Sequence, residues 1–546
     1  MVITDFLERN ARMHPFDTAL VEINPSEERD QAVTWREMSL LGETAKDVPY
    51  RREITWEQFE EKANRFANLL LSRGIKRGQK VGILMMNCLE WLPIYFGVLK
   101  SGAIVVPMNF RYSSDEIEYC LDLADVETFI FGPEFIERLA PVVPKNKKIK
   151  TYFFVGKSEE TPEYADNYSE LVRYCSDSVP PVINEPEDLA AIYFSSGTTG
   201  FPKAILHNHK GLCQAAVMEQ KHHGQQKDDV FLLLPPLYHT GAKMHWFGSL
   251  VSSSKAVILR GIKPEWILRV VTEEKCTIVW LLVPWCQDLL NAIESKQINL
   301  DEYLLDQWRL MHIGAQPVPH SLVERWLRIF PDHQYDTNYG LSESLGPGCV
   351  HLGVENVDHV GAIGVPGFNW QTKIVDEKGN EVPEGEVGEL AVKGDGVMLE
   401  YYKNPEATAE SLHDGWLFTG DMAKMEDGFI YLVDRKKDVV ISGGENIYPV
   451  QIEDFMHGFE KIKDVAVIGL PDERLGEIAA AIVELKPGVE CTEEEINAFC
   501  EQLPRYKRPK KIIFDDVPRN PTGKIEKPVL RKRYSKARLI EAQTMA

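Results

Sequence analysis

Paired cysteines, a surplus of basic residues and long apolar runs are all missing from this sequence. Its nine cysteines are scattered and none forms a Cys-x-x-Cys pair, so we expect a reduced, cytoplasmic protein with no cysteine zinc framework. The 61 basic residues face 83 acidic ones, a net charge of −22, which disfavours nucleic acid and anionic membranes as partners. The longest apolar runs, such as residues 277–285, are too short to span a bilayer, so no integral membrane span is expected.

The chain does contain enough apolar material for a large folded core. Hydrophobic residues make up 44% and charged residues 26% of the 546 residues, which are ordinary values for globular proteins. At roughly 100–200 residues per domain, this length predicts several compact units.

Strand and helix patterns alternate through the first two thirds of the chain. Residues 54–75 have helical apolar spacing that ends at Gly74, a strand pattern covers 80–86, a helix pattern covers 89–102, and another strand pattern covers 103–109. Strand patterns return at 229–234, 255–260 and 276–283. This rhythm predicts an α/β architecture with parallel sheets through about residue 360. The polar segments 26–31 and 43–53 are expected to be surface loop.

The pattern changes twice after residue 360. From about 361, short strands separated by Gly and Pro predict a small β-barrel or sheet. Residues 450–546 alternate helix and strand patterns and predict a separate small α+β domain.

The strongest chemical signal is the segment FSSGTTGFPK at 194–203, which follows a strand pattern. Its glycines and hydroxyl residues offer backbone N–H groups and hydroxyls that can surround a phosphate chain, and Lys203 adds positive charge. A Gly/Ser linker is the alternative, but linkers seldom carry Pro-Lys directly after a strand and a glycine turn. The segment is not a Walker A motif, which requires GxxxxGK[ST].

Further motifs follow in order: LPPLYHTG (234–241), GAQPV (314–318), NYGLSES (338–344), TGD (419–421), DRKKDVVISGGENIYPVQIE (434–453) and NPTGKIEK (520–527). Together with the glycine-rich loop they resemble the adenylate-forming superfamily, which contains acyl-CoA synthetases, adenylation domains of peptide synthetases, and luciferases. The resemblance covers nearly the whole chain. It implies an α/β fold with a large N-terminal domain, residues 1–434, that has two parallel-sheet α/β subdomains and a small distorted β-barrel. A small mobile α+β domain, residues 435–546, would follow a hinge near 434–437.

The resemblance assigns a nucleotide site to residues from several motifs. The residues implied to bind ATP or AMP are Ser195, Ser196, Gly197, Thr198, Thr199, Gly200, Lys203, Gly314, Ala315, Gln316, Asn338, Tyr339, Gly340, Ser342, Asp421 and Arg435. Tyr339 would stack on adenine, and Asp421 would accept the two ribose hydroxyls. Thr199 and Glu343 would hold Mg²⁺, a hard cation that prefers oxygen ligands.

The catalytic assignments also follow from the resemblance. Lys524 would reach the α-phosphate and the substrate carboxylate during adenylation, Arg435 would contact ribose and phosphate, and His239 would gate between acid and thiol. Lys437 would be the hinge. Ser442, Gly443, Gly444 and Glu445 would line the tunnel for coenzyme A. Two glycines there permit a thin chain to approach closely.

The acyl pocket is predicted from His239, Thr240, Trp246, Gly340, Leu345 and Gly346, with Gly314 near the same wall. This lining is largely apolar and has no evident cation for a second carboxylate. We therefore predict a monocarboxylic acid with an apolar body: medium-chain fatty, aryl or alicyclic. Gly346 would leave room for it, and Trp246 would close the far end.

The sequence thus predicts an AMP-forming acyl-CoA ligase that uses ATP, Mg²⁺ and coenzyme A. One alternative is a stand-alone adenylating enzyme that delivers acyl groups to a carrier protein; another is a luciferase-like oxygenase. A third is a non-catalytic acyl- or nucleotide-binding scaffold, although the glycine-rich loop and Lys524 are intact. A kinase-type phosphotransferase, which would form ADP, is disfavoured because the sequence contains no kinase or Walker motif. The sequence leaves a homodimer open.

Overall fold

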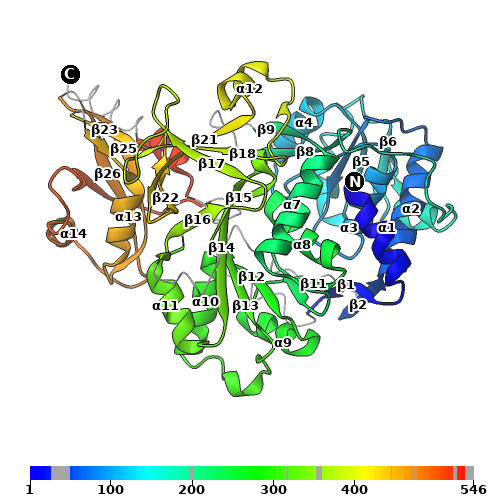
Figure 1. Cartoon of the computed structure of the whole chain (residues 1–546), viewed down its shortest axis with the longest axis horizontal. Coiled ribbons are helices and arrows are strands. Elements are labelled where there is room, and N and C mark those ends of the chain that lie inside the picture. The colour runs from blue at the N-terminus through cyan, green and yellow to red at the C-terminus, as the bar shows by residue number, and fades with distance from the viewer. Residues whose placement is uncertain are drawn as a thin grey trace.

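The computed structural model describes residues 1–25, 50–195, 202–314, 318–351, 359–443, 445–472, 474–519 and 525–534. Figure 1 shows the C-terminal strands β23, β25 and β26 at one end of the long axis, with α2 and β6 near the other. The sequence-predicted α/β architecture with a small C-terminal α+β domain is confirmed.

The longest sheet joins a parallel half to an antiparallel half. Its strand order is β17-β18-β21-β22-β16-β15-β14-β13-β12-β10-β11-β1-β2, with β20 paired to β21. The strands from β14 to β1 pair in parallel and those from β17 to β14 pair antiparallel. The bounds are β1 Thr18–Ile23, β2 Arg51–Thr55, β10 Val230–Leu233, β11 Lys255–Leu259, β12 Ile278–Leu282, β13 Leu310–Gly314, β14 Gln334–Leu341, β15 Gly346–His351, β16 Ala362–Pro366, β17 Gln371–Val375, β18 Gly388–Lys393, β20 Leu412–His413, β21 Trp416–Glu426 and β22 Phe429–Arg435.

A second sheet has the order β19-β9-β8-β4-β3-β5-β6-β7. It is parallel from β8 to β7, whereas β9 and β19 are antiparallel to their neighbours. The bounds are β3 Lys80–Leu84, β4 Ile104–Pro107, β5 Val126–Phe131, β6 Thr151–Phe154, β7 Asp166–Asn167, β8 Leu189–Ser195, β9 Lys203–Asn208 and β19 Glu400–Tyr401. Runs of consecutive buried residues, as in β4 and β12, fit strands covered on both faces.

The C-terminal domain has its own sheet, in the order β24-β23-β26-β25 with β27 beside β26. The bounds are β23 Val440–Ser442, β24 Glu445–Ile447, β25 Ile462–Asp472, β26 Gly476–Leu485 and β27 Lys511–Phe514. Helices α13 (Pro449–His457) and α14 (Glu493–Cys500) accompany it. Hydrophobic clusters within residues 440–534 are separate from those of the rest of the chain, so this domain has a core of its own.

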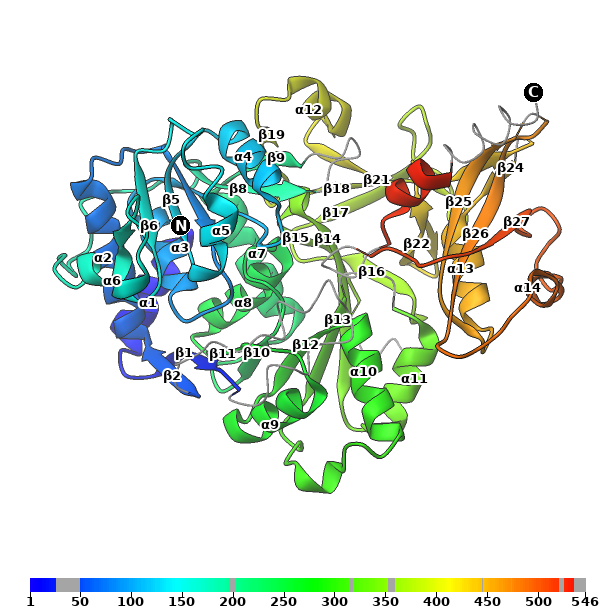
Figure 2. The ribbon, with the colours of Figure 1, turned by 180° about the vertical axis from the view of Figure 1, so that it is seen from behind.

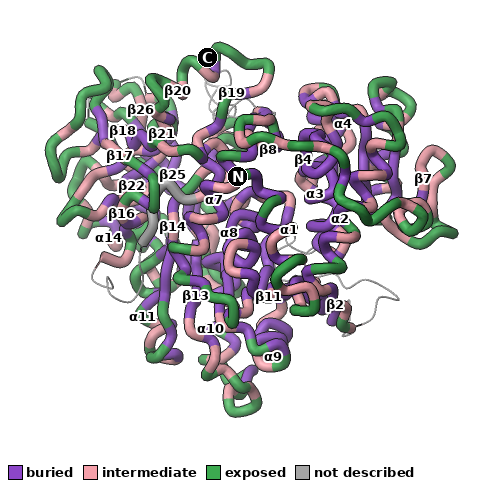
Figure 3. Tube along the Cα trace, turned by 45° about the vertical axis from the view of Figure 1, so that its right-hand side comes forward, coloured by how far each residue is buried: buried purple, intermediate pink, exposed green. Residues whose placement is uncertain are grey.

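The remaining helices connect and cover the two larger sheets. Their bounds are α1 Ile3–Met13, α2 Trp56–Ser72, α3 Trp91–Lys100, α4 Ser114–Leu123, α5 Ile136–Leu139, α6 Tyr168–Val172, α7 His209–His222, α8 Thr240–Ser252, α9 Pro264–Glu274, α10 Val283–Glu294, α11 His320–Ile329 and α12 Pro405–Ser411. Helices α7 and α8 pack together, and α7 contacts both β9 and β15, so it lies between the sheets (Figure 2). Figure 3 shows that buried residues are concentrated in central elements such as α8 and β13. In the described part of the chain, no helix is long and apolar enough to cross a membrane.

Helix α2 shows how local sequence sets an element. The Thr55 side chain caps the helix by accepting from the backbone N–H of Gln58. In turn, the side-chain oxygen of Gln58 accepts from the backbone N–H of Thr55. Gly74, with φ of 82°, lies just past its end. The helix and strands expected between residues 54 and 109 are therefore present with slightly shorter bounds.

One sequence-based expectation is wrong at residues 51–53. This polar segment was expected to be surface loop, but it forms part of β2, paired antiparallel with β1. Arg52 explains the difference, because its guanidinium bonds the buried carboxylate of Glu22 at 2.6 Å and that of Glu90 at 2.9 Å. A polar strand is stable here because its charges are paired. The segments at 26–31 and 43–49 lie outside the described residues.

Trp246 is a core residue rather than a pocket wall. It is 0% exposed, and its ring lies 5.9 Å from that of Phe59 on α2 and 5.8 Å from that of Phe96 on α3. Its predicted place at the end of the acyl pocket is corrected by these contacts, which use the face of α8 that packs on α2 and α3.

We expect Trp246→Ala to lower the free energy of unfolding by about 3–5 kcal/mol, because it empties a large, fully buried volume. Denaturant titration measures this loss. If the variant were as stable as the wild type and preferred different acids, Trp246 would instead be a residue of the acyl pocket.

Candidate active site

The two strands that flank the glycine-rich loop bring Ser195 and Lys203 side by side. Ser195 ends β8, Lys203 begins β9, and the two residues are paired across the antiparallel ladder. Residues 196–201 between them, with the predicted Ser196, Gly197, Thr198, Thr199 and Gly200, lie outside the described residues. This register places the two ends of the predicted phosphate-binding loop next to each other.

Glu343 meets this hairpin from a distant part of the chain. Its Oε1 accepts from the Ser195 hydroxyl at 3.1 Å and from the Tyr401 hydroxyl at 3.0 Å. The Lys203 ammonium lies 4.6 Å from the centroid of the Tyr401 ring. Carboxylate and hydroxyl oxygens thus gather beside a cation, an arrangement suited to a phosphate–metal pair.

A second polar group surrounds Asp421, which is 4% exposed. Asp421 and Arg435 face each other across β21 and β22, and Arg435 Nε lies 2.7 Å from Asp421 Oδ1. The Tyr339 hydroxyl donates to Asp421 Oδ2. The charge of Asp421 raises the pKa of Arg435, and burial followed by that same charge raises the pKa of Tyr339. The predicted ribose and adenine residues are therefore direct neighbours.

The predicted pocket-mouth loop contacts the NYGLSES segment. Thr240 Oγ1 lies 3.2 Å from Ser342 Oγ, and His207 Nε2 lies 2.9 Å from the Ser342 carbonyl oxygen. Burial lowers the pKa of His207 to about 3, so this ring is neutral and donates to the carbonyl. These bonds join β9, α8 and the turn at 342–344.

Two groups hold the loop before α8 in place. Asn87 donates to the Pro235 carbonyl at 2.9 Å and accepts from the Leu237 N–H at 2.7 Å. The buried Lys243 ammonium donates to the carbonyls of residues 237, 238 and 239 at 3.2–3.4 Å. Burial holds the pKa of Lys243 well below its usual value. His239 caps α8 by accepting from the Gly241 N–H at 3.2 Å.

Backbone forms much of the wall near the predicted pocket glycines. A Cβ on Gly340 would lie 2.2 Å from the Gly346 carbonyl oxygen, so no side chain fits there. Gly346 has a φ of 107°, which disfavours other residues, and the buried Leu345 precedes it. A Cβ on Gly314 would meet only ordinary contacts, 3.7 Å or more away.

Several predicted residues do not join this group. Ser442, Gly443 and Glu445 lie in the β23–β24 hairpin of the C-terminal sheet. Asn338 donates to His245 Nε2 at 3.1 Å, within a group of buried histidines. Lys524, Gly444, Ala315 and Gln316 fall outside the described residues.

Sequence reasoning missed Tyr401, His207 and Lys243. Tyr401 sits in a two-residue strand and His207 inside β9, where nothing local distinguishes them from core residues. A lysine at the fourth position of the apolar helix 240–252 is the one available signal, because buried lysines require partners.

Comparison with known proteins shows the family and the fold. The model of the AMP-binding enzyme family matches residues 7–402, and that of the AMP-binding enzyme C-terminal domain matches 451–524. The long-chain-fatty-acid–CoA ligase FadD13 of Mycobacterium tuberculosis is 32% identical over 485 residues, covering 88% of this chain and 93% of that protein. The 4-hydroxybutyrate–CoA ligase 2 of Metallosphaera sedula is 31% identical, covering 89% and 90%. The crystal structure of ATP-bound MatB from Rhodopseudomonas palustris has a TM-score of 0.83 and 25% identity, covering 98% and 99%.

Proposed function

This chain belongs to the AMP-binding enzyme family and is an acid–thiol ligase that forms acyl-CoA through an acyl-adenylate, and we propose that its acid is an apolar monocarboxylic acid. The single observation that carries the assignment of the site is the convergence of Ser195, Glu343 and Tyr401 beside Lys203. Three segments far apart in the sequence meet there, namely the β8–β9 hairpin, the turn at 342–344 and β19, and this supports an anion and metal site.

In the first half-reaction the acid's carboxylate attacks the α-phosphate of ATP and pyrophosphate leaves. Both reactants are anions, so the site must supply positive charge between them. Lys203, Arg435 and Lys524 are the cations that we assign to this task. Glu343 and Thr199 would hold Mg²⁺, and the oxygen donors around Glu343 fit that ion. When bound, Mg²⁺ would neutralise charge on the phosphates.

The ribose site rests on the pairing of Asp421 with Arg435. Asp421 keeps one oxygen toward Arg435 and the other toward Tyr339, so its remaining lone pairs are available to ribose hydroxyls. The adenine would pack near Tyr339. Held this way, the nucleotide presents its α-phosphate to the acid in a fixed geometry, which contributes to the rate.

In the second half-reaction coenzyme A attacks the acyl carbonyl and AMP leaves. We assign the pivot between the two states to the exposed Lys437, because the residue before it is bonded to the N-terminal domain and the residue after it to the C-terminal domain. Lys436 bonds Glu389 at 2.8 Å, while Asp438 bonds Arg531, in the C-terminal helix at 527–534, at 2.7 Å. A backbone rotation at the residue between would move one domain and leave the other in place. The hairpin with Ser442, Gly443 and Glu445 would then line the thiol's path, with His239 at the mouth of the acyl pocket.

The acyl pocket is proposed between Thr240, Gly314, Gly340, Leu345 and Gly346. Gly340 and Gly346 contribute backbone rather than side chains to this wall, and Met244 lies 3.6 Å from where a Gly346 side chain would begin. The residues named carry no cation that could pair with a second carboxylate. We therefore favour medium-chain fatty, aryl or alicyclic acids.

A panel of acids tests this substrate class. Acid-dependent pyrophosphate exchange is measured first, followed by mass detection of the CoA thioester. We expect the highest kcat/KM for apolar monocarboxylic acids, because an unpaired second carboxylate or ammonium would be costly to bury. A dicarboxylic or amino acid at the top of the ranking would contradict this proposal while leaving the ligase assignment intact.

A further inference from the structure

A group of ionisable side chains is buried behind the acyl pocket and takes no part in the reaction above. Glu219 and His222 lie on α7, His223 ends that helix, His245 lies on α8, His312 on β13 and Asp336 on β14. All six are at most 7% exposed. Glu219, His222 and His223 are spaced i, i+3 and i+4, so they share one face of the helix. The same Glu-x-x-His spacing supplies metal ligands in helical di-metal proteins.

The separations between Asp336 and the two histidines of the α7 end fit ligands of one metal ion. Asp336 Oδ2 lies 3.3 Å from His222 Nε2 and 3.8 Å from His223 Nε2. One ligand atom from each of His222, His223, His312 and Asp336 falls within 4.8 Å of the others. Two ligands of one tetrahedral zinc ion, each at about 2.0–2.1 Å from it, lie about 3.3 Å apart.

We propose that His222, His223, His312 and Asp336 bind one divalent transition-metal ion of the zinc class. Three imidazoles and one carboxylate form a closed, four-ligand set of the kind that structural zinc sites use. Both ring nitrogens of the buried His223 have no hydrogen-bond partner among the described residues. Such buried donors and acceptors are costly unless something binds them.

The hydrogen-bond chain beyond His312 supports the same assignment. His245 Nδ1 lies 2.6 Å from the Gly241 carbonyl oxygen, which requires the proton on Nδ1 and leaves Nε2 as an acceptor. His312 Nε2 lies 2.7 Å from that acceptor and must carry a proton to bond it. A neutral imidazole carries only one N–H, so His312 Nδ1 then has no proton. Its lone pair is available to a metal ion. Its 2.6 Å contact with Asp336 Oδ1 would widen to about 3.3 Å around the ion.

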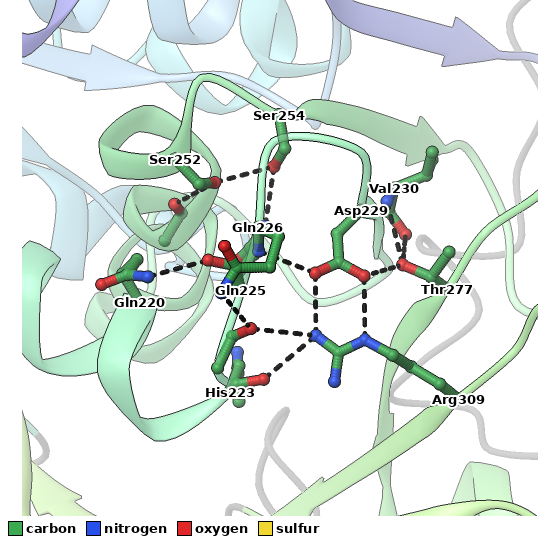
Figure 4. Close-up of polar contacts among 12 residues, drawn as sticks. Gln220, His223, Gln225, Gln226, Asp229, Val230, Ser252, Ser254, Thr277 and Arg309 are labelled. Carbon is green, nitrogen blue, oxygen red and sulfur yellow. Dashed lines mark hydrogen bonds and ion pairs between the residues drawn. The ribbon is translucent and has the colours of Figure 1, made fainter.

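The backbone that carries His223 is fixed by a polar network on its other side (Figure 4). Arg309 makes two bonds to Asp229, at 2.8 and 2.9 Å, and donates to the His223 carbonyl at 3.1 Å. Thr277 donates to Asp229 at 2.6 Å. This network holds the end of α7 against β12 and β13, so the two helical histidines are presented to Asp336 in advance.

Metal content of untagged, purified protein tests the proposal. After removal of loosely bound ions, elemental analysis is expected to find about one equivalent of zinc per chain, because four protein ligands bind tightly. His223→Ala is expected to retain less than about a tenth of that amount. His209→Ala is the matched control: His209 is a buried histidine on the same helix, outside the group, and this variant should keep its metal.

A second measurement covers the case in which His223→Ala does not fold. The wild-type protein is unfolded, stripped of metal and refolded with Co²⁺ alone, and the visible absorption bands of four-coordinate Co²⁺ are expected. A wild-type protein with no bound transition metal and no cobalt spectrum would overturn the proposal, as would a folded His223→Ala variant that keeps its full metal content. Neither readout depends on the acyl substrate, so failure here is distinct from failure of the proposed function.

Discussion

Lys524→Ala is expected to slow acyl-adenylate formation by about 10²–10³-fold, because the first half-reaction loses a cation between two anions. Thioester formation from supplied acyl-adenylate should remain largely intact, since the carboxyl group of the acid is then already activated as a mixed anhydride with AMP. Pyrophosphate exchange measures the first step, and single-turnover formation of the CoA thioester measures the second.

The exposed Lys511, on β27 of the same domain, provides the control. Lys511→Ala removes one positive charge from the same domain and should leave both half-reactions unchanged. If Lys524→Ala slowed both half-reactions equally, that result would contradict the proposal that Lys524 acts in adenylation and not in thioester formation.

Asp421→Asn is expected to lower kcat/KM for ATP by about 10²-fold, the loss of about 3 kcal/mol of charge-assisted bonding. Asparagine keeps the shape of the side chain, but it cannot accept from Arg435, Tyr339 and two ribose hydroxyls together. Steady-state kinetics with varied ATP measures the effect, and a thermal melt of the variant checks that the fold survives.

Asp427→Asn makes the same chemical change at the exposed turn between β21 and β22 and should behave as wild type. If Asp421→Asn changed kcat/KM for the acid but not for ATP, Asp421 would not be a ribose ligand.

The sequence was sufficient for the family and for the main architecture. The segment FSSGTTGFPK and the later motifs identify the family because each combines unusual residue types at fixed order along the chain. The strands at 80–84 and 278–282 could be predicted because a strand buried on both faces reads as an uninterrupted apolar run. The continuous pairing of β14 with β15, which joins the parallel and antiparallel halves, carries no such local signal.

Contacts between segments far apart in the chain could not be predicted from the sequence. Trp246 could face either side of an apolar helix, and only the rings of Phe59 and Phe96 show which side is core. The buried histidine group shows the same limit more strongly. The pair His222-His223 is visible in the sequence, yet His312 and Asp336 join it only because β13 and β14 are adjacent.

The same distinction applies to the residues of the candidate active site. The resemblance to the adenylate-forming superfamily supplied Ser195, Lys203, Glu343 and Asp421 as candidates, because each lies in a motif that matches that family. It could not supply Tyr401, whose hydroxyl reaches Glu343 from a strand paired with β9. That neighbour depends on the packing of the whole second sheet.

Analysis of the nucleotide product is the most direct test of the central claim. The purified protein is incubated with ATP, Mg²⁺, coenzyme A and an apolar monocarboxylic acid, and the products are separated and quantified. We predict AMP, pyrophosphate and CoA thioester in equal amounts, with no turnover when the acid is left out. ADP and inorganic phosphate as products, or ATP cleavage that needs no acid, would contradict the account.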